Sequence, residues 1–112
     1  MSDSHYDLAI IGAGPGGYVS AIRAAHHGLR VALVDPNPPG GVCLHTGCIP
    51  TKTMVASVDL LRQAQQSSQL AVSIAQAEAQ LASIVERRQK VVAKLAAGVQ
   101  NLIDKNGVDY FS

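Results

Sequence analysis

A glycine-rich turn near the start of the chain constrains the fold more than any other feature. The pattern G-x-G-x-x-G spans residues 12–17. It directly follows an apolar run, residues 6–11, that is typical of a strand, and it directly precedes residues 15–27, which have helical periodicity. A second apolar run, residues 31–34, comes next. The opening of the chain therefore predicts a β-α-β unit, and its continuous apolar runs predict parallel strands covered on both faces.

Each residue of the glycine turn has a role in binding a dinucleotide. Gly12 permits the tight turn, Gly14 lets the backbone approach a pyrophosphate, and Gly17 lets the helix pack closely on the strand. Pro15 suits the first helical turn, whose unpaired amides attract an anion without a nearby basic side chain. Asp35 ends the second run, where an acid accepts hydrogen bonds from an adenosine ribose, and this favours a nucleotide site over a chance glycine turn. The pattern predicts an ADP moiety, which FAD and NAD both carry.

Composition narrows the classes of function. The chain has 112 residues, of which 47% are apolar and 15% charged, with a formal net charge of +1. These values predict one globular domain, and the absence of any run of like charge argues against nucleic acid as a partner. No apolar stretch approaches the roughly 18 residues of a membrane span, and residues 1–7 form a short polar leader unlike a signal peptide. We therefore expect a cytoplasmic chain with no membrane partner.

The second part of the chain has a helical pattern. Residues 50–66 predict a helix whose end Ser67 and Ser68 loosen, and apolar residues recur every three or four positions from about Ile74 to Asn106. The apolar stripe of this long helix packs against its own domain or, alternatively, forms a helical hairpin or a partner contact. Residues 108–111 resemble the beginning of a strand. The expected fold is α/β and incomplete: β-α-β, followed by two helices and the start of a strand.

Two cysteines lie five positions apart, Cys43 and Cys48. A disulfide needs Cα atoms about 5.5 to 6 Å apart, and five steps along a regular helix at roughly 1.5 Å each already exceed that span. A bridge therefore requires an irregular turn, for which Gly47 supplies backbone freedom. Two unrelated core thiols and a zinc half-site are the alternatives, although no second pair of metal ligands follows. His45 between them is interpreted as a loop residue, and no metal site is expected.

The position of the second cysteine favours redox chemistry. Cys48 is expected at or just before the N-terminus of a helix, whose dipole favours a thiolate, with Lys52 one turn further on. A pair of this kind can alternate between disulfide and dithiol. One thiol then exchanges with a substrate disulfide while the other resolves the mixed disulfide or faces a cofactor.

These motifs together resemble a known family. G-A-G-P-G-G-Y at residues 12–18, Asp35, and G-G-V-C-L-H-T-G-C-I-P-T-K at residues 40–52 are similar to the flavoprotein pyridine nucleotide-disulfide oxidoreductases, and most similar to their dihydrolipoyl-oxidising branch. The resemblance implies a Rossmann-like FAD/NAD(P)-binding fold. It also implies which residues hold FAD: the ADP half lies on Gly12, Gly14, Pro15, Gly17 and Asp35, and the flavin half lies along Gly41, Val42, Cys43 and Lys52. Gly40 is expected to bind the cofactor as well.

The resemblance also implies roles and partners. Cys48 faces the flavin, Cys43 exchanges with the sulfur of a lipoyl-bearing protein or a small disulfide, and NAD accepts the electrons. Val42 replaces the threonine common in the family, which removes a hydroxyl contact to the cofactor, and Asp35 replaces a frequent glutamate. Residues 1–112 correspond to the N-terminal part of a FAD-binding domain. The NAD-binding and dimerisation domains of the homodimeric parent lie outside it, so no turnover is expected.

Two alternatives stay open at this point. One is a self-standing dinucleotide-binding or thiol-redox module that uses its long helix for association. The other is a sibling reductase that acts on a glutathione-like, mycothiol-like or mercuric substrate, since these enzymes share the same motifs.

Overall fold

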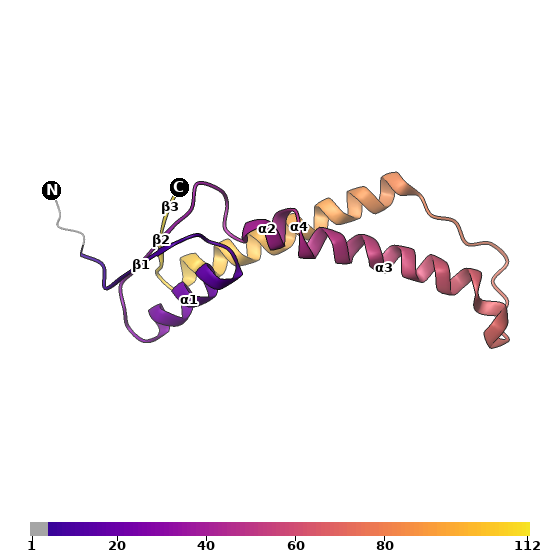
Figure 1. Cartoon of the computed structure of the whole chain (residues 1–112), viewed down its shortest axis with the longest axis horizontal. Coiled ribbons are helices and arrows are strands. Elements are labelled where there is room, and N and C mark those ends of the chain that lie inside the picture. Colours follow the sequence, from indigo (N-terminus) through magenta and orange to yellow (C-terminus); the bar gives the residue numbers. More distant parts are fainter. Residues whose placement is uncertain (1–4) are drawn as a thin grey trace.

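The computed structural model describes residues 5–112; residues 1–4, which begin the expected polar leader, lie outside it. The chain folds into a small sheet from which a pair of long helices projects, with principal extents of 69 × 26 × 19 Å (Figure 1). The elements in chain order are β1 (Leu8–Ile11), α1 (Pro15–His26), β2 (Val31–Val34), α2 (Gly41–His45), α3 (Cys48–Gln65), a 3₁₀-helix η1 (Ser67–Leu70), α4 (Leu81–Lys105) and β3 (Asp109–Phe111).

The three strands form one parallel sheet in the order β1-β2-β3. The prediction of a strand over residues 31–34 is confirmed, whereas β1 begins two residues later than residue 6 and β3 begins at residue 109. The parallel pairing of β1 with β2 across α1 confirms the β-α-β unit. The fold is the Rossmann-like arrangement expected, with one additional short helix, α2.

The helices α1 and α4 cover one face of the sheet. Their buried residues Ala21 and Ile103 pack with Val31 and Leu33 of β2 in a single core. The expectation that both strands are covered on both faces is therefore wrong for β1, along which half-buried and exposed residues alternate and where Ile11 is 91% exposed. Successive side chains of a strand point to opposite faces, so the pleat alternation of β1 appears as an alternation in burial.

The apolar stripe of the long helix α4 packs on its own domain and also forms a helical hairpin. Its C-terminal half packs on the sheet through Val99 and Ile103, and its N-terminal half runs beside α3 as a helical hairpin (Figure 1). The guanidinium of Arg87 on α4 donates a hydrogen bond to the backbone oxygen of Thr53 on α3 at 3.0 Å. The hairpin therefore has a specific polar contact across its interface.

The predicted start of the long helix near Ile74 is wrong, because α4 begins at Leu81. The chain leaves α3 through η1 and a turn at Ala71, whose φ is +58°. Residues 71–80 are then exposed apart from the half-buried Ala77. Short helical turns depend on tertiary packing for their stability, and this stretch has an exposed Ile74 rather than a buried apolar face.

Candidate functional site

Cys43 and Cys48 form a disulfide with a Cα–Cα distance of 4.6 Å. Cys43 lies within α2, Cys48 is the first residue of α3, and Thr46 and Gly47 separate the two helices. This break confirms the irregular turn that the spacing requires. The expected start of the second helix at Pro50 is corrected to Cys48, because the helix begins as soon as the turn at Gly47 ends.

Gly47 serves the turn through its small size. Its φ is −114° and its ψ is −102°. The Gly47 amide donates to the carbonyl oxygen of Val42 at 2.6 Å, and a Cβ at residue 47 would stand 3.0 Å from that oxygen. A side chain here would crowd the hydrogen bond that folds Cys48 back toward Cys43.

The two sulfurs differ in their surroundings. Cys43 is half-buried and Cys48 is exposed. Lys52, also exposed, follows Cys48 by four residues on α3, so the two lie on one helix face as predicted. His45 ends α2 instead of lying in a loop, and its Nε2 is 3.1 Å from the carbonyl oxygen of Pro39. The exposed positive charge at Lys52 and the start of α3 both favour a thiolate at Cys48.

The glycine turn has the geometry that its sequence predicts. Gly12 has a φ of +99°, and its amide donates to the carbonyl oxygen of Val34 at 2.7 Å. A Cβ at Gly17 would stand 1.7 Å from the carbonyl oxygen of Gly12, so only glycine lets α1 start this close to the strand. Pro15 is the first residue of α1, and the cap position Gly14 supplies no side-chain hydrogen bond to the helix start.

The glycine turn and the disulfide segment are in direct contact. The Gly40 amide donates to the carbonyl oxygen of Ala13 at 2.8 Å. Gly41 has a φ of +62°, and a Cβ on it would stand 2.7 Å from the Cα of Gly14. Both glycines belong to the predicted site, but nothing in the sequence pattern predicts that they touch the first turn. The structure thus joins the two motifs into one surface.

Asp35 holds this surface together through its carboxylate. Its Oδ2 accepts a hydrogen bond from the Ala13 amide at 2.8 Å, and its Oδ1 accepts from the Asn37 amide at 2.9 Å. These hydrogen bonds, the one from Ala13 first, lower the pKa of the Asp35 carboxyl from its ordinary value of 3.8. The carboxylate is therefore ionised and anchored to the glycine turn.

Sequence reasoning missed Tyr110. This β3 residue donates from its hydroxyl to the carbonyl oxygen of Asp35 at 3.1 Å and also to that of Asn37. Burial of the ring, followed by the charge of Asp35, raises the pKa of the Tyr110 hydroxyl above 10.0. The contact joins residues 75 positions apart, and the only signal in the sequence was a tyrosine in the predicted last strand.

The sequence profile of the pyridine nucleotide-disulphide oxidoreductases matches residues 6–112. The chain belongs to this family. It is 43% identical over 109 residues to dihydrolipoyl dehydrogenase of Bacillus subtilis strain 168, and the matched region covers 97% of this chain and 23% of that protein. It is 42% identical over 112 residues to dihydrolipoyl dehydrogenase of Zymomonas mobilis, covering 100% of this chain and 24% of that protein. It is 44% identical over 108 residues to dihydrolipoyl dehydrogenase of Acholeplasma laidlawii, covering 96% of this chain and 32% of that protein.

The chain spans between 23% and 32% of the length of these three curated relatives. The match nevertheless includes both motifs of the candidate site, residues 12–18 and 40–52. In this chain of the pyridine nucleotide-disulphide oxidoreductase family, the disulfide and the glycine turn thus lie within the part shared with its relatives.

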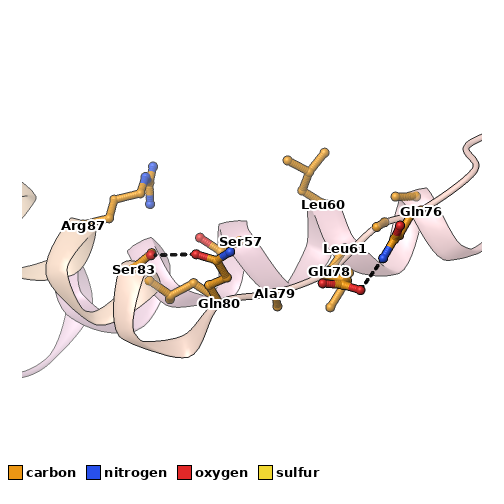
Figure 2. Close-up of a pocket in the computed structure, with 12 residues that line it drawn as sticks. Ser57, Leu60, Leu61, Gln76, Glu78, Ala79, Gln80, Ser83 and Arg87 are labelled. Atoms are coloured by element: carbon orange, nitrogen blue, oxygen red, sulfur yellow. Dashed lines mark hydrogen bonds between the residues drawn. The ribbon is translucent and has the colours of Figure 1, made fainter.

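A separate groove of this family member lies away from the disulfide. A groove of about 670 Å³ separates α3 from the segment that leads into α4 (Figure 2). Its polar side chains bond to one another: Gln76 donates to Glu78, and Ser83 donates to Gln80. Neither cysteine lines it, so its size does not make it the candidate site.

None of the helices within residues 5–112 combines the length and the apolar character needed to cross a bilayer. No three side chains of His, Cys, Asp or Glu in that range come together as ligands for a metal ion.

Proposed function

We propose that the chain carries the redox disulfide and the ADP-binding part of a flavin-dependent dithiol/disulfide oxidoreductase of the dihydrolipoyl dehydrogenase type. One observation carries the proposal: the segment that bears the Cys43–Cys48 disulfide contacts the glycine turn at Gly14 through Gly41. A nucleotide held by that turn would thus lie next to the helix that bears Cys43.

The residues present fit FAD. The first turn of α1 receives no side-chain cap from Gly14, and its amides are available to a pyrophosphate. Gly14 leaves an open backbone, because a Cβ on it would meet nothing within 4 Å, and Gly41 lets the disulfide segment lie against it. The ADP half would be held by Gly12, Gly14, Pro15, Gly17 and Asp35, and the flavin half by Gly40, Gly41, Val42, Cys43 and Lys52. Val42 is 76% exposed, so its side chain offers an apolar contact where a hydroxyl is missing.

The chain's own sulfurs perform the exchange with substrate. A thiolate of a dihydrolipoyl group attacks Sγ of Cys43, which forms a mixed disulfide and breaks the bond to Cys48. Cys48 leaves as a thiolate that the N-terminus of α3 and Lys52 stabilise, and a more stable thiolate leaves faster. The second substrate thiolate then attacks its own bound sulfur, so the substrate becomes a cyclic disulfide and Cys43 is released as a thiolate.

The balance of this exchange is two electrons from the substrate to the cysteine pair, with two protons released. FAD bound beside Cys48 would supply the route by which these electrons reach NAD and regenerate the disulfide. Cys43 and Cys48 are the catalytic residues of the proposal.

The relatives' names supply the proposed substrate and setting. Their common name favours dihydrolipoyl groups on a partner protein over glutathione-like, mycothiol-like or mercuric substrates. We place residues 1–112 in the N-terminal part of a FAD-binding domain, with the NAD-binding and dimerisation domains of a cytoplasmic homodimer outside this range. The coverage of 23% to 32% of each relative supports that assignment.

The proposal is tested with the purified chain. Dihydrolipoamide is expected to convert the disulfide into two free thiols, and ADP is expected to shift the amide resonances of residues 12–14, 16 and 17. Cys43→Ser serves as the control for the thiol count. Failure of dihydrolipoamide to release thiols, or of ADP to perturb the glycine turn, would contradict the proposed function. Lipoamide-dependent oxidation of NADH by the chain alone would contradict the assignment of the missing domains.

A further inference from the structure

Two sets of hydrogen bonds hold the turn that follows β2. The Asp35 carboxylate accepts hydrogen bonds from the amides of Ala13 and Asn37. The Tyr110 hydroxyl donates to the backbone oxygens of Asp35 and Asn37. A phenol has a single donor proton, so the two oxygens share it and are held close together. Tyr110 thereby closes the turn whose amide orients the Asp35 side chain.

The Asp35 carboxylate retains capacity for a ligand. A carboxylate accepts about four hydrogen bonds. Among the described residues, Oδ1 accepts two, from the backbone and side-chain nitrogens of Asn37 at 2.9 and 3.4 Å, and Oδ2 accepts one, from Ala13. The remaining acceptor position lies on Oδ2, the oxygen bound to the glycine turn. A hydroxyl of a ribose seated beside that turn would donate to it.

We infer that Tyr110 is a positioning residue for the ribose contact of Asp35. The inference rests on the proposed nucleotide site. Tyr110 bonds to the backbone oxygens of the two residues, Asp35 and Asn37, whose side chain and amide form the contact to Oδ1, and so limits how far the carboxylate can turn. Loss of its hydroxyl leaves every nucleotide-contacting group in place but frees the Asn37 carbonyl, and with it the amide that holds Oδ1. The preference for a nucleotide with an intact 2′-hydroxyl therefore depends on a β3 side chain.

The experiment compares Tyr110→Phe with the wild-type chain. Dissociation constants for ADP and for 2′-deoxy-ADP are measured by calorimetry. The value of one hydrogen bond predicts that ADP binds Tyr110→Phe roughly two- to tenfold more weakly. The affinity for 2′-deoxy-ADP is expected to stay within about twofold of wild type, because it lacks the hydroxyl that Asp35 accepts. The ratio of the two constants reports positioning, since a change in global stability alters both equally.

A ligand-free readout accompanies the binding. Exchange of the Ala13 and Asn37 amides with deuterium is expected to accelerate in Tyr110→Phe, while the buried strand residue Leu33 serves as the internal reference. Tyr6→Phe is the matched control. Tyr6 stacks edge-on against Phe111 and carries Arg30 over its ring, so the control also removes a tyrosine hydroxyl beside β3 but leaves the turn intact.

The outcomes separate the inference from the function on which it rests. An unchanged ratio in Tyr110→Phe, in a wild-type chain that prefers ADP to 2′-deoxy-ADP, overturns the inference alone. An equal loss for both nucleotides also overturns it, because the effect would then be general. A wild-type chain that does not distinguish the two nucleotides overturns the proposed ribose site and the inference with it. If Tyr110→Phe lowers the ratio of the dissociation constant of 2′-deoxy-ADP to that of ADP, and amide exchange at Ala13 is faster, the result supports the inference and the proposed ribose site.

Discussion

A Cβ built on Gly41 stands 2.7 Å from the Cα of Gly14, closer than any side chain can approach a backbone atom. The glycine turn and the helix that bears Cys43 are therefore packed backbone to backbone. The hydrogen bond from the Gly40 amide to the Ala13 oxygen reinforces the contact at 2.8 Å. Displacement of one segment consequently displaces the other, and the disulfide is coupled mechanically to the proposed nucleotide site.

This coupling predicts the effect of Gly41→Ala. The φ of +62° alone costs an alanine about 1 to 2 kcal/mol of unfolding free energy, and the contact with Gly14 must open as well. We expect a lower midpoint of urea unfolding together with weaker ADP binding. Gly98→Ala is the control: Gly98 lies in α4 with nothing within 4 Å of an added Cβ, and there alanine adds about 0.5 to 1 kcal/mol. Unchanged stability and ADP affinity in Gly41→Ala would show that the two segments are independent.

Without the disulfide, the effect of neighbouring charges on the Cys48 thiolate can be tested. In Cys43→Ser the remaining thiol lies at the first residue of α3, one turn before Lys52. We expect Lys52→Gln in this background to slow alkylation of Cys48 by iodoacetamide roughly twofold, the size of one exposed i,i+4 charge interaction. Lys90→Gln is the control, because Lys90 pairs with Glu86 on α4. Equal rates in all three proteins would remove Lys52 from the stabilisation of the thiolate.

The features that the sequence predicted correctly are those that neighbouring residues determine. The tight turn at Gly12, the strand over residues 31–34, Pro15 at the start of α1 and Cys48 at the start of a helix all follow from spacing within a few positions. The disulfide belongs to this group, because a five-residue spacing and a glycine between the cysteines restrict the local geometry.

The features that could not be predicted from the sequence depend on contacts between distant segments. The hydroxyl of Tyr110 meets Asp35 only because β3 pairs with β2, and Gly41 meets Gly14 only because the chain returns over the first turn. The start of α4 was predicted too early for a related reason. A periodic apolar pattern indicates that a helix is possible, but Ile74 is 47% exposed and gains too little from packing to extend the helix to that point.

The pH dependence of stability tests the anchoring of Asp35. Hydrogen bonds from Ala13 and Asn37 hold the pKa of this carboxyl below its ordinary 3.8 in the folded chain. A lowered folded pKa adds stability that is fully present well above pH 3.8 and is lost as the pH falls through the folded pKa. We expect Asp35→Asn to lose less unfolding free energy than wild type below about pH 4. Asp59→Asn, at an exposed position of α3, is the control; an identical acid slope in wild type and Asp35→Asn would show that the carboxylate contributes nothing.

Arg87 tests whether the helical hairpin opens independently of the sheet. Its guanidinium donates to the Thr53 oxygen at 3.0 Å, and Arg87→Gln removes that hydrogen bond, which is worth about 1 kcal/mol. Since the core residues Leu33 and Ile103 lie in the sheet region, local opening of the hairpin need not disturb them. We expect faster deuterium exchange at α3 amides beyond Thr53 and no change at Leu33.

Lys94→Gln provides the comparison for Arg87→Gln, because Lys94 is an exposed cation on the same helix. It should leave exchange in α3 unchanged. Equal acceleration at α3 and at Leu33 in Arg87→Gln would instead mean that hairpin and sheet unfold as one unit. In that case the hydrogen bond to Thr53 would stabilise the whole chain, and the hairpin could not move without disturbing the disulfide at the start of α3.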